Sequence, residues 1–250
     1  MSPAPARFLT VGEGGLAVEL GSGIDEQVNA RVHLLAAAVR RELGDLVEEL
    51  VPTYRSLLLL FDPLRLPRAR LVASVEALLA GLERAGAAPG GGRVVRVPVA
   101  YGGELGPDLA FVARHAGISE EEVIALHAGA LYRVFMLGFT PGFPYLGGMS
   151  ERIAAPRLDS PRARIPAGSV GIAGAQTGIY SVESPGGWRL IGRTPLRLFD
   201  PAAPSPFLLA AGDRVRFRPC SEREYRKLAA RAEAGDQALE LEPDAVGAPP

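Results

Sequence analysis

The side chains with the most evident chemistry lie in two glycine-rich segments in the second half of the chain. The first is GFTPGFPYLGG, residues 138–148, and it carries the aromatic residues Phe139, Phe143 and Tyr145. Glycine permits positive φ and proline fixes φ, so this mixture predicts a loop held to one path. The rings could wall a pocket in which loop amides receive an anion or a carbonyl group. The alternative is that the rings only cover the protein core.

The second segment, residues 164–195, alternates glycine-rich turns with polar side chains. Between residues 152 and 200, seven arginines accompany three acidic residues, a local excess of four positive charges. Guanidinium groups pair well with carboxylates and phosphates, so this balance favours a small anionic ligand. Arginines that only decorate the outer face of β-strands are the alternative. The polar and aromatic candidates here are Gln176, Thr177, Tyr180, Ser184, Trp188 and Arg193.

The composition disfavours several other kinds of catalytic site. Lys227 is the only lysine and no GxxxxGK[ST] motif occurs, so neither a P-loop nor Schiff-base catalysis is expected. Cys220 is the only cysteine, and no HExxH motif or Cys/His cluster indicates a metal ion. Ser169 in AGSVG lacks the first glycine of the GxSxG pattern of serine hydrolases. The three histidines fall in predicted helices, where a structural role is the default.

Charge and hydropathy indicate a cytoplasmic protein. Twenty-seven basic and 28 acidic residues give a net charge of −1, which leaves no electrostatic footprint for nucleic acid. The N-terminus has no basic segment followed by an apolar run, so no secretory signal is expected. The uncharged stretches 134–150 and 165–182 are too broken by glycine and proline to be membrane helices. A single cysteine fits a reducing compartment.

The elements that must position these residues fall into two predicted domains. Residues 1–84 predict a small α+β domain of order ββαββα, followed by a Gly- and Ala-rich linker at 85–93. Alternation and helical periodicity predict its strands and helices at 6–11, 15–20, 25–43, 46–52, 55–61 and 67–84.

Residues 94–220 predict a second domain built mainly of β-strands. It begins with a strand at 93–100, and two short helices follow. Short segments between Gly/Pro turns then indicate a closed or sandwiched β structure, with strands at 131–137, 169–174, 177–182, 188–192, 196–199 and 213–219. Residues 221–250 predict a helical segment and then a disordered tail, because apolar periodicity is lost there.

Four long segments in order resemble one known family. They are YGGELGPDL, LHAGALYRVFMLGFTPGFPYLGG, PAGSVGIAGAQTGIY and SPGGWRLIGRTPLRLFDP. The family they resemble contains the B subunit of 5-oxoprolinase, the KipI-type inhibitors of sporulation histidine kinase, and the allophanate hydrolase subunit 1 domain found also in urea carboxylase. The resemblance runs from the N-terminal hairpin to about Pro219. It implies a small N-terminal α+β domain followed by a cyclophilin-like β-barrel.

The resemblance also implies a function. It points to the B subunit of a heteromeric 5-oxoprolinase that hydrolyses 5-oxo-L-proline to L-glutamate with ATP, which would come with Mg²⁺ and be shared with partner subunits. The partners would be a homologous second subunit of the C type and a third of the A type. Phosphorylating the lactam oxygen would make a poor electrophile reactive, and such a site needs donors for phosphoryl oxygens and a clamp for the carboxylate. A urea-carboxylase role fits least, because Lys227 lacks the context of a biotinylated lysine.

The same resemblance implies a shared site without assigning catalytic roles. Its residues here are Tyr101, Glu104, His127, Phe139, Phe143, Tyr145, Gln176, Thr177, Tyr180, Trp188 and Arg193. If the first glycine-rich segment serves this site, Phe143→Ala should lower complex formation or turnover more than the melting temperature. A KipI-like inhibitor of histidine kinase autophosphorylation is the alternative function. A peptidyl-prolyl isomerase is a third, which rests on fold analogy alone.

Overall fold

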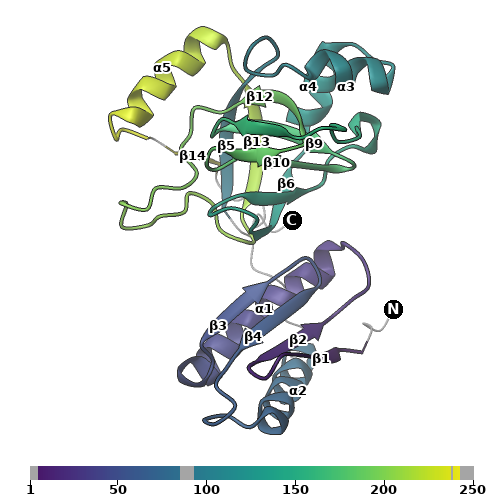
Figure 1. Cartoon of the computed structure of the whole chain (residues 1–250), viewed down its shortest axis with the longest axis vertical. Helices are drawn as coiled ribbons and strands as arrows, with labels where there is room; N and C mark the ends of the chain where they lie inside the picture. Colours follow the sequence, from purple (N-terminus) through teal and green to yellow (C-terminus); the bar gives the residue numbers. More distant parts are fainter. Residues whose placement is uncertain (1–4, 85–92, 238, 243–250) are drawn as a thin grey trace, which may run out of the picture. The chain divides into compact units, whose positions relative to one another are not determined.

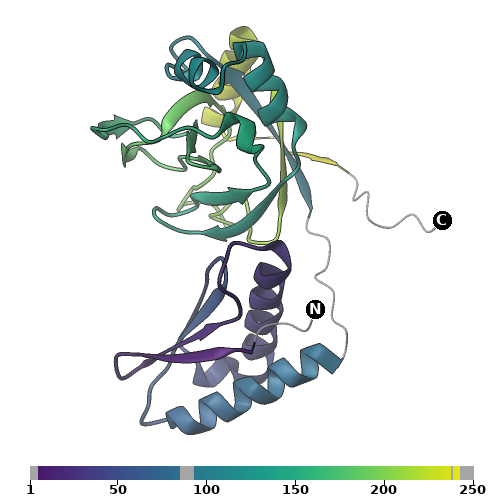
Figure 2. The ribbon, with the colours of Figure 1, turned by 90° about the vertical axis from the view of Figure 1, so that its right-hand side faces the viewer.

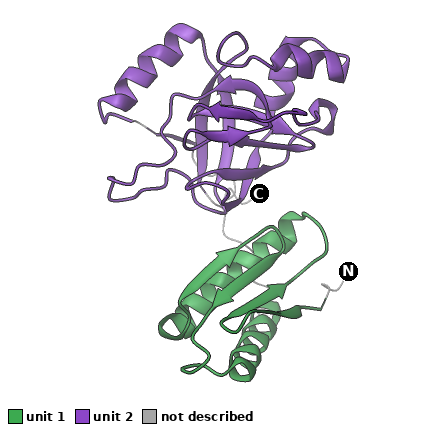
Figure 3. Ribbon diagram, viewed as in Figure 1, with its two compact units in different colours: residues 1–90 green, residues 91–250 purple. Residues whose placement is uncertain are grey.

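The structure is a computed structural model that describes residues 5–84, 93–237 and 239–242. The chain divides into two compact units, residues 1–90 and 91–250 (Figure 3). Both mix helices with sheets in which most strand pairs are antiparallel, the pair of β5 (Val94–Tyr101) and β13 (Arg214–Pro219) in the second unit being parallel, which confirms the predicted α+β class. The predicted linker falls almost entirely on residues outside the described ranges, so its boundaries stay a prediction.

The first unit is a four-stranded antiparallel sheet with two helices on one face (Figure 2). Its strands lie in the order β1-β2-β4-β3 across the sheet. Along the chain, its strands and α-helices follow in the predicted order ββαββα. Leu57 and Leu59 of β4 alternate with half-buried neighbours and pack beneath the helices. Asp25 caps the first helix by accepting from the amides of Gln27 and Val28. The elements are β1 (Arg7–Val11), β2 (Gly15–Glu19), α1 (Glu26–Leu43), β3 (Glu49–Pro52), β4 (Ser56–Leu60) and α2 (Arg68–Arg84).

The second unit is a closed β-barrel (Figure 1). Strands run in the order β12-β9-β10-β7-β6-β13-β5, and β12 pairs with β5 through Gly192–Tyr101 and Arg193–Ala100 to close it. Closure removes the exposed strand edges of an open sheet. The strands are β5 (Val94–Tyr101), β6 (Tyr132–Leu137), β7 (Pro144–Gly147), β9 (Ser169–Ala173), β10 (Gln176–Ile179), β12 (Arg189–Arg193) and β13 (Arg214–Pro219).

In the described part of this unit, three α-helices and one short 3-10 helix (Glu151–Ile153) accompany the barrel. The α-helices are α3 (Leu109–Ala116), α4 (Glu120–Gly129) and α5 (Glu222–Glu233). Gly117, at φ 68°, ends α3 in the left-handed conformation, and the Ser119 side chain caps α4 through the amide of Glu122. Among the helices of the described ranges, none combines the length and the hydropathy that crossing a bilayer requires.

The structure corrects the predictions for several segments of this unit. Residues 144–147 form the barrel strand β7, although the sequence predicts a loop throughout residues 138–148. Gly147 is needed in that strand, since a Cβ there would lie 1.8 Å from the Phe135 ring. Residues 196–199 contribute only one bridge, between Phe199 and Phe207. The sequence pattern also missed the two-stranded sheet of β8 (Arg162–Ile165) and β11 (Ser184–Gly186).

The tail is also more ordered than expected within residues 239–242. Strand β14 (Glu240–Glu242) pairs with β5 in antiparallel register. Glu242 forms ion pairs with Arg96 and Arg216 at 2.6 and 3.1 Å. The prediction of disorder was wrong for this strand, because charge pairs and backbone hydrogen bonds replace the apolar periodicity on which it relied. The predicted disorder of residues 243–250 lies outside the described residues.

Candidate functional site

Phe143 is the centre of an aromatic cluster that is separate from the barrel core. Its ring makes edge-to-face contacts with four others, Phe139, Tyr145, Tyr180 and Trp188, at centroid separations of 5.2 to 5.7 Å. Such T-shaped pairs are the favourable geometry for aromatic quadrupoles. Three segments of the chain, residues 139–145, the residues after β10 and those before β12, therefore meet at the Phe143 ring.

These rings line a cavity of about 330 Å³, called here the aromatic cavity. The rings come from the β6–β7 loop, from β7 and from the segments after β10 and before β12. The opposite walls come from the segment before β8 and from β11. Its full lining is Phe139, Phe143, Tyr145, Arg157, Pro161, Tyr180, Pro185, Gly186, Gly187 and Trp188. Small-molecule sites are commonly apolar hollows of this kind with few polar groups.

Phe139 holds an unusual position at the mouth of this cavity. It has φ 67° and is the one non-glycine residue of the described ranges with positive φ. Its ring is 65 % exposed, whereas Phe143 is 2 % exposed. A left-handed conformation costs a bulky residue roughly 1–3 kcal/mol and persists where the surroundings impose it. The loop that precedes β7 therefore holds Phe139 in a left-handed conformation and presents its ring to solvent.

Phe143 itself does not behave as a purely functional wall. Its burial and its four ring contacts make it the core of the aromatic cluster. Gly178 of β10 leaves room for it, since a Cβ there would lie 2.8 Å from the Phe143 ring. The structure therefore favours the alternative in which this ring supports the protein interior, and it does not support the expectation that Phe143→Ala would spare stability.

Arg157 brings a charge to the aromatic cavity. It is exposed, and it has no ion pair or hydrogen bond to any described residue. Its charge acts on Tyr180: burial raises the pKa of the Tyr180 hydroxyl, and the positive charges of Arg157 and Arg162 oppose that rise. The sequence places Arg157 only among the seven arginines of residues 152–200, and their local charge excess was the signal that pointed towards it.

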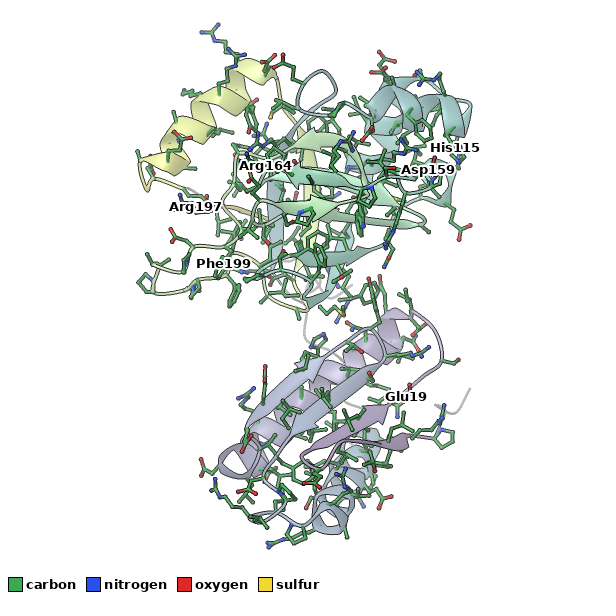
Figure 4. The ribbon with its side chains drawn as sticks, in the orientation of Figure 1. Glu19, His115, Asp159, Arg164, Arg197 and Phe199 are labelled. Atoms are coloured by element: carbon green, nitrogen blue, oxygen red, sulfur yellow. The ribbon has the colours of Figure 1, made fainter. Side chains whose placement is uncertain are left out.

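The other arginines of residues 152–200 are engaged. Arg162 bonds the buried carboxylate of Asp108, with Nη1–Oδ2 at 2.9 Å. Arg189 lies over the Phe111 ring at 3.6 Å. The remaining ones, two of them labelled in Figure 4, pair as Arg152–Glu122, Arg164–Glu183 and Arg197–Asp200, while the Arg193 Nε donates to the Ala167 carbonyl.

A second cavity, called here the polar cavity, measures about 560 Å³. Two expected site residues, Tyr101 and Glu104, line it. Cys220 lies there too, and burial raises the pKa of its thiol to about 11, so it is not a reactive thiolate near neutrality. The complete lining is Ala100, Tyr101, Gly102, Gly103, Glu104, Leu105, Cys220, Ser221, Glu222 and Arg226.

His127 links Tyr101 to the barrel interior. The Thr177 hydroxyl donates its one proton to the Gly171 carbonyl at 3.0 Å, so it accepts from the His127 Nε2–H, also at 3.0 Å. Nδ1 then carries no proton and accepts from the Tyr101 hydroxyl at 2.8 Å. Burial lowers the pKa of His127 from 6.5 to about 3, so the imidazole is neutral. This geometry orients the Tyr101 phenol.

The eleven expected residues therefore do not meet in one place. Five line the aromatic cavity, two line the polar cavity, and His127 and Thr177 are buried behind Tyr101. Gln176 and Arg193 line neither cavity. In the described part of the chain, no group of three or more His, Cys, Asp or Glu side chains is placed to hold a metal ion.

Comparisons of this chain with known proteins agree on one family. The family model described as "Carboxyltransferase domain, subdomain C and D" matches residues 6–209. The chain is 47 % identical over 225 residues to the 5-oxoprolinase B subunit of Bacillus subtilis (strain 168), covering 86 % of this chain and 93 % of the relative. It is 43 % identical over 219 residues to the 5-oxoprolinase B subunit of Escherichia coli O157:H7, covering 87 % and 97 %.

A solved structure shares the fold. The crystal structure of TTHA0988 superposes with a TM-score of 0.72 at 43 % identity and covers 83 % of this chain. This chain spans about 40 % of the length of that one. The barrel and the preceding α+β unit thus occur also within a longer polypeptide.

Proposed function

Because the chain belongs to the family of the carboxyltransferase domain, subdomain C and D, we propose that it is the B subunit of a heteromeric, ATP-dependent 5-oxoprolinase. One observation carries the proposal: two relatives named as the B subunit of 5-oxoprolinase are matched over 93 % and 97 % of their own length. That name implies further subunits. The reaction proposed is hydrolysis of 5-oxo-L-proline to L-glutamate in the cytoplasm.

The two cavities fit a small organic acid better than a nucleoside triphosphate. A triphosphate with Mg²⁺ needs several cationic or amide donors around its oxygens. The aromatic cavity offers one unpaired cation, Arg157. In the polar cavity, Arg226 is already paired with Glu222, and Glu104 adds negative charge. We therefore assign the phosphates of ATP to a partner subunit and the lactam to this one.

The test is reconstitution from separate subunits. This chain, a homologous C-like subunit and an A-like subunit would be purified, and phosphate release that depends on 5-oxoproline would be measured for each combination. We expect turnover from the full set and negligible turnover from this chain alone. Turnover by the isolated chain, or equal turnover when it is omitted, would contradict the proposal.

A second candidate, inhibition of a histidine kinase, is favoured by one specific observation. The exposed rings of Phe139 and Phe207 share an open apolar groove of about 410 Å³, and exposed apolar surface is what a protein-docking site requires. A kinase autophosphorylation assay with added chain distinguishes the two. Inhibition that persists in Phe139→Ser/Phe207→Ser would exclude this groove as the docking surface.

A further inference from the structure

The segment that carries Arg157 has a fixed backbone and an uncommitted side chain. Ala155 and Gly174 exchange two backbone hydrogen bonds, at 2.8 and 3.2 Å. Arg189 Nε donates to the Pro156 carbonyl at 3.2 Å, and the Leu158 amide donates to the Gly187 carbonyl at 2.7 Å. Residues on both sides of Arg157 are thus held against β12 and its neighbours, while the guanidinium group has no partner among the described residues.

Among the arginines of residues 152–200, this combination is found only at Arg157. The other six arginines of residues 152–200 are each engaged by a carboxylate, a carbonyl or an aromatic ring. Arg157 alone among them lines the aromatic cavity. A guanidinium held beside apolar walls is a strong recognition group for a carboxylate, because it can donate two parallel hydrogen bonds.

The remaining walls define what the rest of the ligand must look like. They are aromatic rings, two prolines and two glycines, with no carboxylate side chain among them. Flat apolar walls suit a small ring, and a hollow of about 330 Å³ is at the lower end of the range for small-molecule sites. Tyr180 adds a hydroxyl, which lies against Gly186 of β11. One cation and one small apolar hollow fit a small ring with a single carboxylate.

We propose that the aromatic cavity is the lactam-binding site, in which Arg157 pairs with the carboxylate of a small cyclic acid while the surrounding rings hold its five-membered ring. This inference rests on the proposed function for the identity of the acid, 5-oxo-L-proline. It assigns to Arg157 the specificity for an acidic ligand. Arg193, although it was expected at the site, is engaged elsewhere.

Trp188 makes the proposal directly testable. It is the only tryptophan of the chain and it lines the cavity, so its fluorescence reports on ligand in that cavity. The full-length chain would be titrated with 5-oxo-L-proline and with 2-pyrrolidinone, the same ring without the carboxylate. We expect a saturable change with the acid and affinity about 10- to 100-fold weaker for the neutral lactam, which is the range of a charge-assisted hydrogen bond.

Two variants identify the arginine. Arg157→Gln should weaken 5-oxoproline binding by the same factor of about 10 to 100 and leave 2-pyrrolidinone binding unchanged, while Arg157→Lys should retain part of the affinity. Arg152→Gln is the matched control, because it removes the same charge from an exposed arginine outside the cavity. It should bind as the wild type does.

The outcomes separate this inference from the proposed function. Absence of a saturable Trp188 response in the wild-type chain, or equal losses in Arg157→Gln and Arg152→Gln, would overturn the inference. Turnover by the reconstituted enzyme with an unchanged KM in Arg157→Gln would also overturn it while leaving the proposed function intact. Binding with the expected variant pattern but no turnover in any combination of subunits would support the cavity assignment and contradict the proposed function.

Discussion

At the scale of single residues, His127 is a neutral histidine whose imidazole is difficult to protonate in the folded protein. It is completely buried, and among the described residues the polar partners of its ring are Tyr101 and Thr177. Neither hydroxyl carries a charge near neutral pH that could stabilise an imidazolium. Its role is to hold the Tyr101 phenol at the wall of the polar cavity, which makes it a positioning residue.

This burial predicts a loss of stability in mild acid. The pKa of His127 is about 3 in the folded state and 6.5 as the ordinary value, so the unfolded chain takes up the proton first. The contribution of His127 to stability is therefore fully present above pH 6.5 and declines as the pH falls towards 3. Between pH 7.5 and pH 5 the decline should be about 2 kcal/mol.

The measurement is urea unfolding of the wild type and His127→Gln at several pH values. The stability gap between the two proteins should narrow by about 2 kcal/mol from pH 7.5 to pH 5. His115→Gln, which replaces an exposed histidine stacked on Phe111, serves as the control and should follow the wild type. A gap independent of pH would show that His127 takes up its proton as readily in the folded protein as in the unfolded chain.

Truncating Phe139 and truncating Phe143 should lower stability by very different amounts. Phe143→Ala removes a ring that is 2 % exposed and should cost about 3–5 kcal/mol. Phe139→Ala removes a ring that is 65 % exposed and should cost less than about 1 kcal/mol. Thermal unfolding of both variants gives the comparison. If Phe143→Ala melts with the wild type, the ring is not the support of the aromatic cluster.

At the scale of elements, strand β11 sets the shape of the aromatic cavity. A Cβ on Gly186 would lie 2.3 Å from the Tyr180 hydroxyl and 2.9 Å from Ile165 Cδ1, so any side chain there displaces the ring. At the neighbouring Gly187 the nearest atom to an added Cβ would be 3.7 Å away, an ordinary contact. The two glycines therefore form a matched pair of test positions.

Gly186→Ala should destabilise the protein by about 1–3 kcal/mol through overpacking and weaken ligand binding in the cavity. Gly187→Ala should resemble the wild type in both respects. Calorimetry gives the stability and the Trp188 titration gives the binding. Equal behaviour of the two variants would mean that the contact between β11 and Tyr180 does not define the cavity.

At the scale of the whole molecule, the chain consists of two units with separate cores. Leu57, Leu59 and their neighbours form one core under α1 and α2, and the barrel encloses another. Each unit buries its own apolar surface, which is the usual condition for a domain. The Gly- and Ala-rich residues 85–93 join them.

This organisation predicts where a protease cuts first. Arg84 directly precedes the predicted linker and Arg93 is its last residue, so brief trypsin digestion should cleave after these arginines and release two resistant fragments. Residues 131–200 contain more arginines and serve as an internal control. Early fragments from cuts within 131–200, with residues 85–93 intact, would contradict the proposed boundary.

The sequence by itself determined the α+β class, the ββαββα order and most strands of the barrel. These depend on local periodicity, caps and turn residues, which adjacent residues carry. Its four long segments also sufficed to indicate the family. The local excess of arginine indicated an anion near residues 152–200, but not which arginine is free to bind it.

Tertiary structure decided which residues share a site. Closing the barrel sends the aromatic residues of the two glycine-rich segments to one cavity and buries His127 behind Tyr101 at another. The sequence pattern missed strand β7 because its Pro144 and Gly147 are residues typical of turns. The reason for Gly147 appears only in the tertiary structure, where the Phe135 ring occupies the space that a Cβ would need. Arg157 differs from the other arginines of residues 152–200 because its guanidinium group has no partner among the described residues. Packing decides which residues distant in sequence become partners, so the local sequence pattern could not show this difference.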